Sequence, residues 1–335
     1  MDDLTALVDS VAAESRFSGA VRIDRGAEFV LDAAFGFANR AFEIPNRPDT
    51  QFGVASGLKG LTALVTMTLV DEGVLGLDTP VRAFLGDDLP LIADDVTVEH
   101  LLAHRSGIGD YIDEDAGGEV TEYVLPRPVH ELVGPEDFVP ILDGFPTKFA
   151  AGTSFSYCNG GFVVLALVSE RASGIPYHEL VLDRVCGPAG MTDTAFLRSD
   201  ELPARAATGY LFVDSPRTNV LHLPVRGVGD GGIYTTTADV RAFWTALVAG
   251  AIVPRELVAE MTRPRSDASE RSQYGLGFWL RTGTGVVELE GYDAGVSFRS
   301  LHDPATDTTV TVVANWTDGA WTLVKAVEER VFASS

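Results

Sequence analysis

The chain has 335 residues, of which 46% are hydrophobic and 22% are charged. This length and composition are typical of a globular enzyme with two packed layers or two lobes. The formal net charge is -23, from 48 acidic and 25 basic residues. Nucleic acids and anionic membranes are bound by clustered lysine and arginine side chains. We therefore expect neither a nucleic acid nor a membrane as a partner.

Three further features narrow the class of protein. The longest apolar runs, such as residues 162–168, are far shorter than the roughly 20 residues that a membrane span needs. The N-terminal residues have no basic region followed by an apolar core, so we expect no signal peptide and a cytoplasmic location. Cys158 and Cys186 cannot form a disulfide framework, and no histidines stand near them at ligand spacing. We expect no metal and no cofactor, and the oligomeric state stays open.

The predicted elements follow the order strands, helices, strands. An amphipathic helix at residues 3–14 precedes a hairpin of two strands, 19–24 and 29–38. The helices expected next lie at residues 58–72, 81–85, 97–104, 162–172 and 176–185. The last third is predicted to contain helices at residues 240–248, 254–261 and 320–332, and strands at 275–281, 286–289, 296–302 and 308–315. This order predicts an α/β (α+β) fold with one antiparallel sheet built from both ends of the chain. Residues 1–55 and 220–335 form its sheet lobe, residues 56–219 form an inserted helical lobe, and the active site lies in the cleft between them.

A serine and a lysine stand three residues apart at a predicted helix start, in Ser56-Gly-Leu-Lys59. Positions i and i+3 share one helix face with Cβ atoms about 5–6 Å apart, so the amine can reach the hydroxyl. Unpaired N–H groups at the helix start favour an alkoxide on Ser56, and burial favours a neutral Lys59 that can act as a base. Ser56 is therefore the candidate nucleophile and Lys59 the candidate base. The motif is short, and a chance pairing of the two residues remains the alternative.

A second polar pair, Tyr157 and Asn159, stands in a turn-rich loop before the helix predicted at 162–172. Alternate side chains of an extended segment point the same way, so both residues can face one site while Cys158 turns into the core. Ordinary turn residues are the alternative interpretation. His104, at the end of the helix predicted at 97–104, is interpreted as a structural residue in preference to a base.

The segment 110–146 is acidic and is interrupted by prolines, among them Pro126, Pro128, Pro135 and Pro140. Six of its acidic residues lie between Asp110 and Glu122. Such a segment is expected to be a surface loop or a lid with little regular structure. Simple solvated surface and a lid over the cleft both remain open.

Together, Ser56-x-x-Lys59, Tyr157-x-Asn159 and the strand near Gly291 resemble the serine β-lactamase and penicillin-binding superfamily. The class C-like branch, which also holds esterases and D-aminopeptidases, is the most similar. The resemblance covers most of the chain and implies a β-lactamase/transpeptidase-like fold. It implies that Ser56 forms an acyl-enzyme, that Lys59 and Tyr157 share the proton transfer, and that Asn159 orients the substrate or Lys59.

The third motif departs from the pattern of this branch. The branch carries Lys-Thr-Gly or His-x-Gly there, whereas this chain reads Gly291-Tyr-Asp-Ala-Gly295. On this alignment Tyr292 replaces the cationic residue that contacts a substrate carboxylate. The main-chain N–H near Gly295 is expected to form the oxyanion hole with that of Ser56. Tyr292 is either a neutral hydrogen-bond donor to the substrate or a packed strand residue.

The residues and the resemblance together predict a serine hydrolase. Its expected substrates are small neutral or cationic carboxylic esters, because the acylation residues are present and the cation for an anionic β-lactam is absent. A β-lactamase, a D-amino-acid amidase or a peptidase would use the same chemistry on an amide. A relative that binds a ligand without turnover is the alternative from another class.

Overall fold

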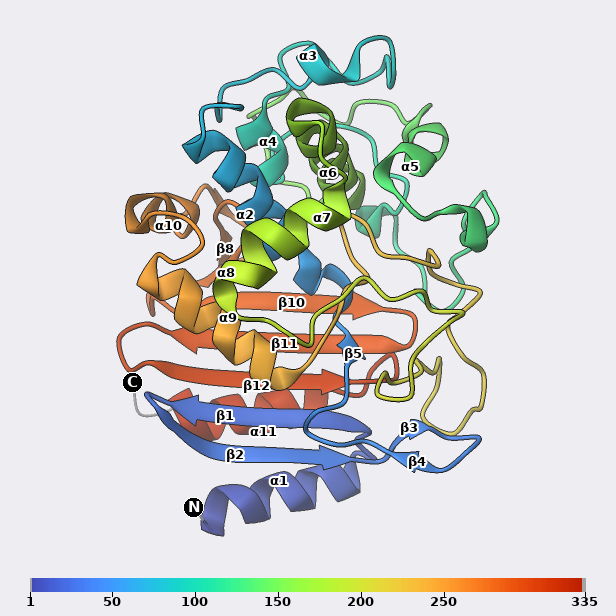
Figure 1. The fold of residues 1–335 in the computed structure, drawn as a ribbon, viewed down its shortest axis with the longest axis vertical. Coiled ribbons are helices and arrows are strands. Elements are labelled where there is room, and N and C mark those ends of the chain that lie inside the picture. Colours follow the sequence, from blue (N-terminus) through green and yellow to red (C-terminus); the bar gives the residue numbers. More distant parts are fainter. Residues whose placement is uncertain (1, 333–335) are drawn as a thin grey trace.

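A computed structural model describes residues 2–332, and its main element is an eight-stranded antiparallel sheet (Figure 1). The strand order is β2-β1-β12-β11-β10-β9-β8-β7. The strands are β1 (Gly19–Arg25), β2 (Glu28–Phe35), β7 (Ser266–Asp267), β8 (Ser272–Tyr274), β9 (Trp279–Arg281), β10 (Val287–Asp293), β11 (Val296–Asp303) and β12 (Thr308–Ala314). Strand β1 pairs with β12, with Gly19 opposite Ala314. The predicted sheet from both chain ends is therefore confirmed.

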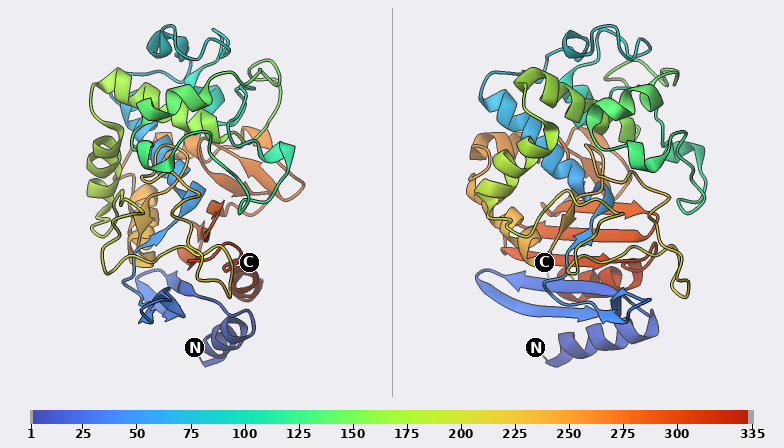
Figure 2. Two further views of the ribbon diagram at one scale, coloured as in Figure 1. Left: turned by 90° about the vertical axis from the view of Figure 1, so that its right-hand side faces the viewer. Right: turned by 45° about the vertical axis from the view of Figure 1, so that its right-hand side comes forward.

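Helices cover both faces of this sheet (Figures 1 and 2). Helices α1 (Asp2–Glu14) and α11 (Trp321–Phe332) pack on one face, and α2 (Leu58–Asp71) and α9 (Thr237–Ala249) pack on the other. The remaining helices are α3 (Arg82–Leu85), α4 (Val98–Leu102), α5 (Pro135–Leu142), α6 (Asn159–Ser173), α7 (Tyr177–Val181), α8 (Gly187–Ala189) and α10 (Arg255–Met261). Most of these form a helical layer above the sheet in Figure 1. The exact lobe boundaries at 55/56 and 219/220 stay a prediction.

Short elements connect these layers. The pairs β3 (Phe37–Asn39) with β4 (Ile44–Pro45) and β5 (Phe52–Gly53) with β6 (Tyr234–Thr235) form two small separate sheets. Single helical turns lie at η1 (Ala55–Gly57), η2 (Glu114–Ala116), η3 (Val129–Glu131) and η4 (Leu182–Cys186). The turn η1 leads directly into α2, and β5 directly precedes η1. The chain thus passes from sheet to helix at the predicted nucleophile.

The two-residue period of the strands divides the apolar side chains between two cores. Along β1, Val21 and Ile23 join the cluster under α1 and α11, whereas Ala20 joins the cluster under α2 and α9. Successive side chains of a strand point to opposite faces, which explains this division. Burial of one Val or Ile side chain contributes roughly 1.5–3 kcal/mol. Both faces of the central strands are therefore apolar and buried.

Three predicted strands differ from the structure. The strand expected at 275–281 is present only as β9, because residues 275–278 form the connection after β8, in which Gly277 has a φ of 87°. The strand expected at 29–38 is interrupted at Gly36, whose φ of 68° suits glycine and no extended strand residue. The strand expected at 286–289 instead runs to Asp293, because β10 pairs with β11 up to the pair Asp293 and Val296. Because β10 extends to Asp293, the third motif lies elsewhere relative to Ser56 than the predicted strand would place it.

Close backbone approach holds β10 against η1. A Cβ atom on Gly291 would lie 2.0 Å from Val54 O and 3.0 Å from Gly57 N. A Cβ atom on Gly57 would lie 2.6 Å from the Phe298 ring. Two glycines thus allow the strand and the nucleophile turn to touch, and this contact fixes where Ser56 stands relative to the sheet.

We expect Gly291→Ala to destabilise the protein by about 1–3 kcal/mol, the usual cost of overpacking, and to reduce activity by displacing β10 from η1. Urea denaturation and kcat/KM measurements check this. Gly134→Ala is the matched control, because its Cβ would meet nothing nearer than Asp137 Oδ2 at 3.9 Å. Equal stability of the two variants would contradict the role of the close approach.

Candidate active site

The candidate nucleophile lies on a strained turn. Ala55, directly before Ser56, has a φ of 45°, which non-glycine residues rarely adopt. The turn η1 then continues into α2, in which every residue from Leu58 to Leu69 is buried. The strain and the buried helix together fix the direction of the Ser56 hydroxyl.

Lys59 is buried one turn after Ser56, as the spacing predicts. Its side chain is 2% exposed, and Lys59 Nζ lies 2.8 Å from Ser56 Oγ. The same nitrogen donates to Asn159 Oδ1 at 2.8 Å and to the main-chain oxygen of Asp230 at 2.7 Å. Burial lowers the pKa of Lys59 below its ordinary value, against the opposing effect of nearby carboxylates.

These three contacts satisfy either form of Lys59, because an ammonium donates to all three oxygens, whereas a neutral amine donates to two and accepts from the Ser56 hydroxyl. Two of the acceptors are carbonyl oxygens, which cannot donate, so they take the two N–H groups of an uncharged Lys59. The lone pair then faces the third partner, the hydroxyl of Ser56. The arrangement suits proton transfer from Ser56 to Lys59.

Tyr157 lies over this pair. Lys59 Nζ is 5.0 Å from the centroid of the Tyr157 ring, and the Tyr157 hydroxyl interacts with Ser56. Burial raises the pKa of Tyr157 well above its ordinary value. The phenol therefore stays protonated at neutral pH and can donate a proton, whereas Lys59 has the depressed pKa that a base needs.

His104 holds Tyr157 in place. Its ring packs on the Tyr157 ring with centroids 4.3 Å apart, and Trp279 stacks with Tyr157 at 5.8 Å. His104 Nδ1 accepts the N–H of Cys158 at 3.0 Å, and its main-chain oxygen accepts the N–H of Ser156 at 3.0 Å. Burial lowers the pKa of His104 well below its ordinary value. The structural interpretation of His104 is therefore supported by its contacts.

Asn159 begins α6 and uses its whole side chain within the protein. Its Oδ1 accepts from Lys59, and its Nδ2 donates to Ile112 O at 3.1 Å and to Glu114 Oε1 at 3.2 Å. Its main-chain N–H donates to Asp110 Oδ2 at 2.6 Å. Of the two roles expected for Asn159, orientation of Lys59 is the one that these contacts favour.

The expected role of Gly295 is not supported. Gly295 lies in the turn between β10 and β11, and its N–H donates to Thr317 Oγ1 at 3.0 Å. Tyr292 lines the pocket, but its hydroxyl donates to Asp318 Oδ1 at 3.0 Å and its ring packs on Trp321. Both assignments came from aligning Tyr292 with the cationic residue of the third motif.

The strand register presents a different N–H group to this side. Opposite residues in an antiparallel ladder alternate between pairs that exchange hydrogen bonds and pairs that do not. Asp293 and Val296 close the β10–β11 turn, so Tyr292 points its N–H to the opposite edge of β10. That is the edge on which Val286 O accepts the N–H of Arg281. The β9 ladder reaches no further than residue 288, which leaves the Tyr292 N–H open toward η1.

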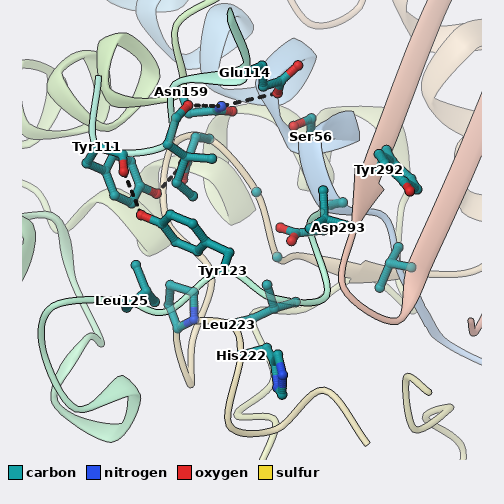
Figure 3. Close-up of a pocket in the computed structure, with 18 of the residues that line it drawn as sticks. Ser56, Tyr111, Glu114, Tyr123, Leu125, Asn159, His222, Leu223, Tyr292 and Asp293 are labelled. Carbon is teal, nitrogen blue, oxygen red and sulfur yellow. Dashed lines mark hydrogen bonds between the residues drawn. The ribbon is translucent and has the colours of Figure 1, made fainter. Parts of the chain in front are cut away.

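Ser56 opens into a pocket of about 770 Å³ (Figure 3). Its walls come from residues 110–125, residues 219–234 and the end of β10. The acidic segment therefore lines the site, as the lid interpretation required. Sequence reasoning missed several of the residues that shape this site, namely Asp110, Asp230, Trp279 and Asp293.

Within residues 2–332 the structure contains neither a metal-binding cluster nor a membrane-spanning helix. No group of three or more His, Cys, Asp or Glu residues there is arranged to hold a metal ion. No helix in that range is long and apolar enough to cross a membrane.

Comparison with known proteins agrees with this geometry. The family model described as Beta-lactamase matches residues 4–331. The chain belongs to the Beta-lactamase family. The crystal structure of a penicillin binding protein from Bacillus halodurans has 35% sequence identity and a TM-score of 0.91, covering 96% of this chain and 99% of that one. The resemblance inferred from the motifs is confirmed, and so is the β-lactamase/transpeptidase-like fold.

Relatives within the Beta-lactamase family carry different activities in their names. Esterase EstB of Burkholderia gladioli is 34% identical over 223 residues, which are 62% of this chain and 54% of EstB. A D-aminopeptidase of Brucella ovis is 31% identical over 234 residues, which are 67% of this chain and 41% of that protein. The matched region thus spans about half the length of these two relatives. The family of this chain is one of serine hydrolases with ester and amide substrates.

We expect Lys59→Ala and Tyr157→Phe each to lower kcat by at least about 10²-fold, the usual effect of losing general acid–base catalysis. The two losses should not multiply in the double variant, because both residues serve one proton relay. Steady-state kinetics of the four proteins check this. A double variant that loses the product of the two single effects would contradict a shared relay.

Proposed function

We propose that the protein is a serine hydrolase that cleaves small neutral or cationic carboxylic esters through an acyl-enzyme on Ser56. The observation that carries the proposal is the 2.8 Å contact between Ser56 Oγ and a buried Lys59 whose other two partners are carbonyl oxygens. This contact supports Lys59 as the base that accepts the Ser56 proton.

In acylation, Ser56 Oγ attacks the ester carbonyl carbon and its proton passes to Lys59 Nζ. The N–H groups of Ser56 and Tyr292 hold the oxyanion of the tetrahedral intermediate. As the intermediate collapses, Tyr157 gives its proton to the leaving alcohol oxygen and regains one from Lys59. The acyl group stays on Ser56 Oγ, and the alcohol departs.

In deacylation, a water molecule takes the place of the alcohol and the same groups act in reverse. The water loses a proton through Tyr157 to Lys59, its oxygen attacks the acyl carbon, and Ser56 Oγ leaves with that proton. The products are the carboxylic acid and the free enzyme. Each step uses only residues that lie together in the structure.

The names of the relatives support two neighbouring activities as well. An amidase or D-aminopeptidase uses the same steps with an amine as the leaving group, and a β-lactamase opens a cyclic amide. We rank the ester activity first because cleavage of an unstrained amide demands more of the leaving-group acid. Binding without turnover is the alternative from another class. The cytoplasmic location expected from the sequence stays a prediction.

We expect a fluorophosphonate probe to label the protein, and p-nitrophenyl acetate and butyrate to be hydrolysed. Both signals should disappear in Ser56→Ala, because the covalent bond forms on Ser56 Oγ. Ser106→Ala is the control, since Ser106 is a buried serine that is not among the residues that line the pocket. A D-amino-acid p-nitroanilide and a chromogenic cephalosporin measure the amidase and β-lactamase alternatives. A folded protein that takes no label and cleaves none of these substrates would overturn the proposal.

The proposed oxyanion hole gives a separate prediction. Tyr292→Phe should change kcat/KM for a neutral ester less than about threefold, because the Tyr292 hydroxyl donates to Asp318 and not to the substrate. Tyr292→Pro removes the N–H from the strand edge that does not pair with β11, and it should cost about 10²–10³-fold in kcat, the loss typical of a missing oxyanion donor. Circular dichroism checks that the fold is retained. Equal kinetics of the two variants would exclude the Tyr292 N–H.

A further inference from the structure

Asp293 is a pocket carboxylate with an unused oxygen. It is the last residue of β10, and its Oδ1 accepts the N–H of Ala294 at 2.8 Å. Within residues 2–332 no group donates a hydrogen bond to its Oδ2 and no basic side chain forms an ion pair with it. In Figure 3 the carboxylate points toward the middle of the pocket, below Ser56. The free oxygen therefore faces the space that a substrate occupies.

The pocket around Asp293 has no basic side chain to neutralise it. Eight carboxylate residues line the pocket, and the lining residues of the described chain include no lysine or arginine. Two of the eight are paired from outside the pocket, because Lys148 contacts Asp113 at 2.6 Å and Arg299 contacts Glu290. Lys59 is not among the lining residues and forms no ion pair with Asp293, although a charge on Lys59 lowers the pKa of Asp293. No ion pair within residues 2–332 therefore compensates a negative charge on Asp293.

The other carboxylates near the nucleophile are already hydrogen-bonded within the protein. Asp110 accepts from the N–H groups of Asn159 and Gly160, and Asp230 accepts from the Tyr111 hydroxyl at 2.6 Å. Glu114 accepts from Asn159 Nδ2. Asp293 differs from these three because its one donor within residues 2–332 is the main-chain N–H of the residue that directly follows it.

Aromatic side chains line the same pocket. Tyr123, Tyr157 and Trp279 contribute to its walls, and Figure 3 shows the Tyr123 ring across the pocket from Asp293. Aromatic faces attract cations, and combinations of aromatic rings with a carboxylate are the usual setting for a bound ammonium group. The aromatic walls and the free carboxylate therefore favour the same class of ligand.

We propose that Asp293 binds a positively charged nitrogen of the substrate, and that the preferred substrates are esters bearing an ammonium or methylated ammonium group. This inference rests on the proposed hydrolase function. It narrows the expected substrates from neutral or cationic esters to cationic ones. It assigns Asp293 as a specificity-determining residue, because the carboxylate contacts the charged group and takes no part in the bond changes at Ser56.

The experiment compares matched pairs of esters that differ in one charge. Acetylcholine and 3,3-dimethylbutyl acetate have the same shape and place the cation on the alcohol side. The p-nitrophenyl esters of 4-(trimethylammonio)butyrate and 5,5-dimethylhexanoate place it on the acyl side. The measured quantity is the ratio of kcat/KM for the cationic ester to that for the neutral ester, which cancels changes in the catalytic residues. The two pairs show on which side of the scissile bond the cation lies.

We expect a ratio of at least about 10 for one pair in the unmodified protein, and a fall of about 10-fold in that ratio for Asp293→Asn. Asp318→Asn is the matched control, since Asp318 is an exposed carboxylate that is not among the pocket-lining residues and its loss should leave the ratio unchanged. Thermal unfolding checks that both variants fold. A ratio near 1 in the unmodified protein, or the same ratio in Asp293→Asn, would overturn the inference.

A binding measurement keeps the test independent of turnover. Tetramethylammonium should bind the Ser56→Ala protein and should bind the Ser56→Ala, Asp293→Asn protein at least about 10-fold more weakly, as measured by calorimetry. If neutral esters are cleaved but the cation preference and the tetramethylammonium binding are absent, the inference fails and the hydrolase function stands. If no ester of either kind is cleaved, the proposed function itself fails.

The pH dependence of the same ratio gives a third measurement. Burial, together with nearby Asp230, raises the pKa of Asp293 to about 7. The other groups around it are Lys59 and Glu114, which act on it electrostatically, and Glu290, Tyr292 and His222, which line the same pocket. Below that pH Asp293 is protonated and neutral, so the cation preference should fall as the pH decreases through about 7. A ratio that stays constant between pH 5.5 and pH 8.5 would contradict the role of Asp293.

Discussion

The active site depends on the burial of one amine. An ammonium group is costly to remove from water, so burial favours the neutral form of Lys59. The two carbonyl oxygens of Asn159 and Asp230 satisfy its N–H groups without providing a formal countercharge, and they leave the lone pair for Ser56. Helix α2 can contain this residue because every position from Leu58 to Leu69 is buried and its buried threonines are hydrogen-bonded within the protein. The fold therefore maintains a base that water would protonate.

Each partner of Lys59 is held by a further contact that is remote in sequence. Asp110 binds the first N–H groups of α6 and so fixes Asn159. His104 binds the main chain on both sides of Tyr157 and packs on its ring. These supports come from the segment that follows α4, and this segment then continues into the acidic wall of the pocket. The orientation of the proton relay and the shape of the substrate site thus depend on the same stretch of chain.

The sequence was sufficient for the parts of the site that are local. Ser56 and Lys59 are one helical turn apart, and Tyr157 and Asn159 alternate in an extended segment, so spacing alone places each pair. The third motif could not be placed in this way. Which N–H of β10 faces Ser56 depends on where the strand ends and on its register with β11, and both are set by pairing and by the close approach of Gly291. The alignment that set Tyr292 at the position of the cationic residue led to Gly295 as the expected oxyanion donor, whose N–H donates to Thr317 Oγ1 in the structure. The acidic lining of the pocket was likewise set by tertiary structure, since nothing local shows which carboxylates stay unpaired.

The pairing of β1 with β12 has a consequence for how the molecule is made. Residues opposite each other in this ladder, such as Gly19 and Ala314, are separated by most of the chain. Contacts between distant residues slow folding, because the chain must close a long loop before they form. Until the last strands are synthesised, one edge of the N-terminal hairpin lacks its partner, and unpaired edges invite association with other chains. Strand β10, which contacts η1, also lies in the last fifth of the chain. The contact therefore forms only after this part has been synthesised. A ribosome-bound fragment that contains Ser56, Lys59 and Tyr157 therefore still lacks the strand that completes the site.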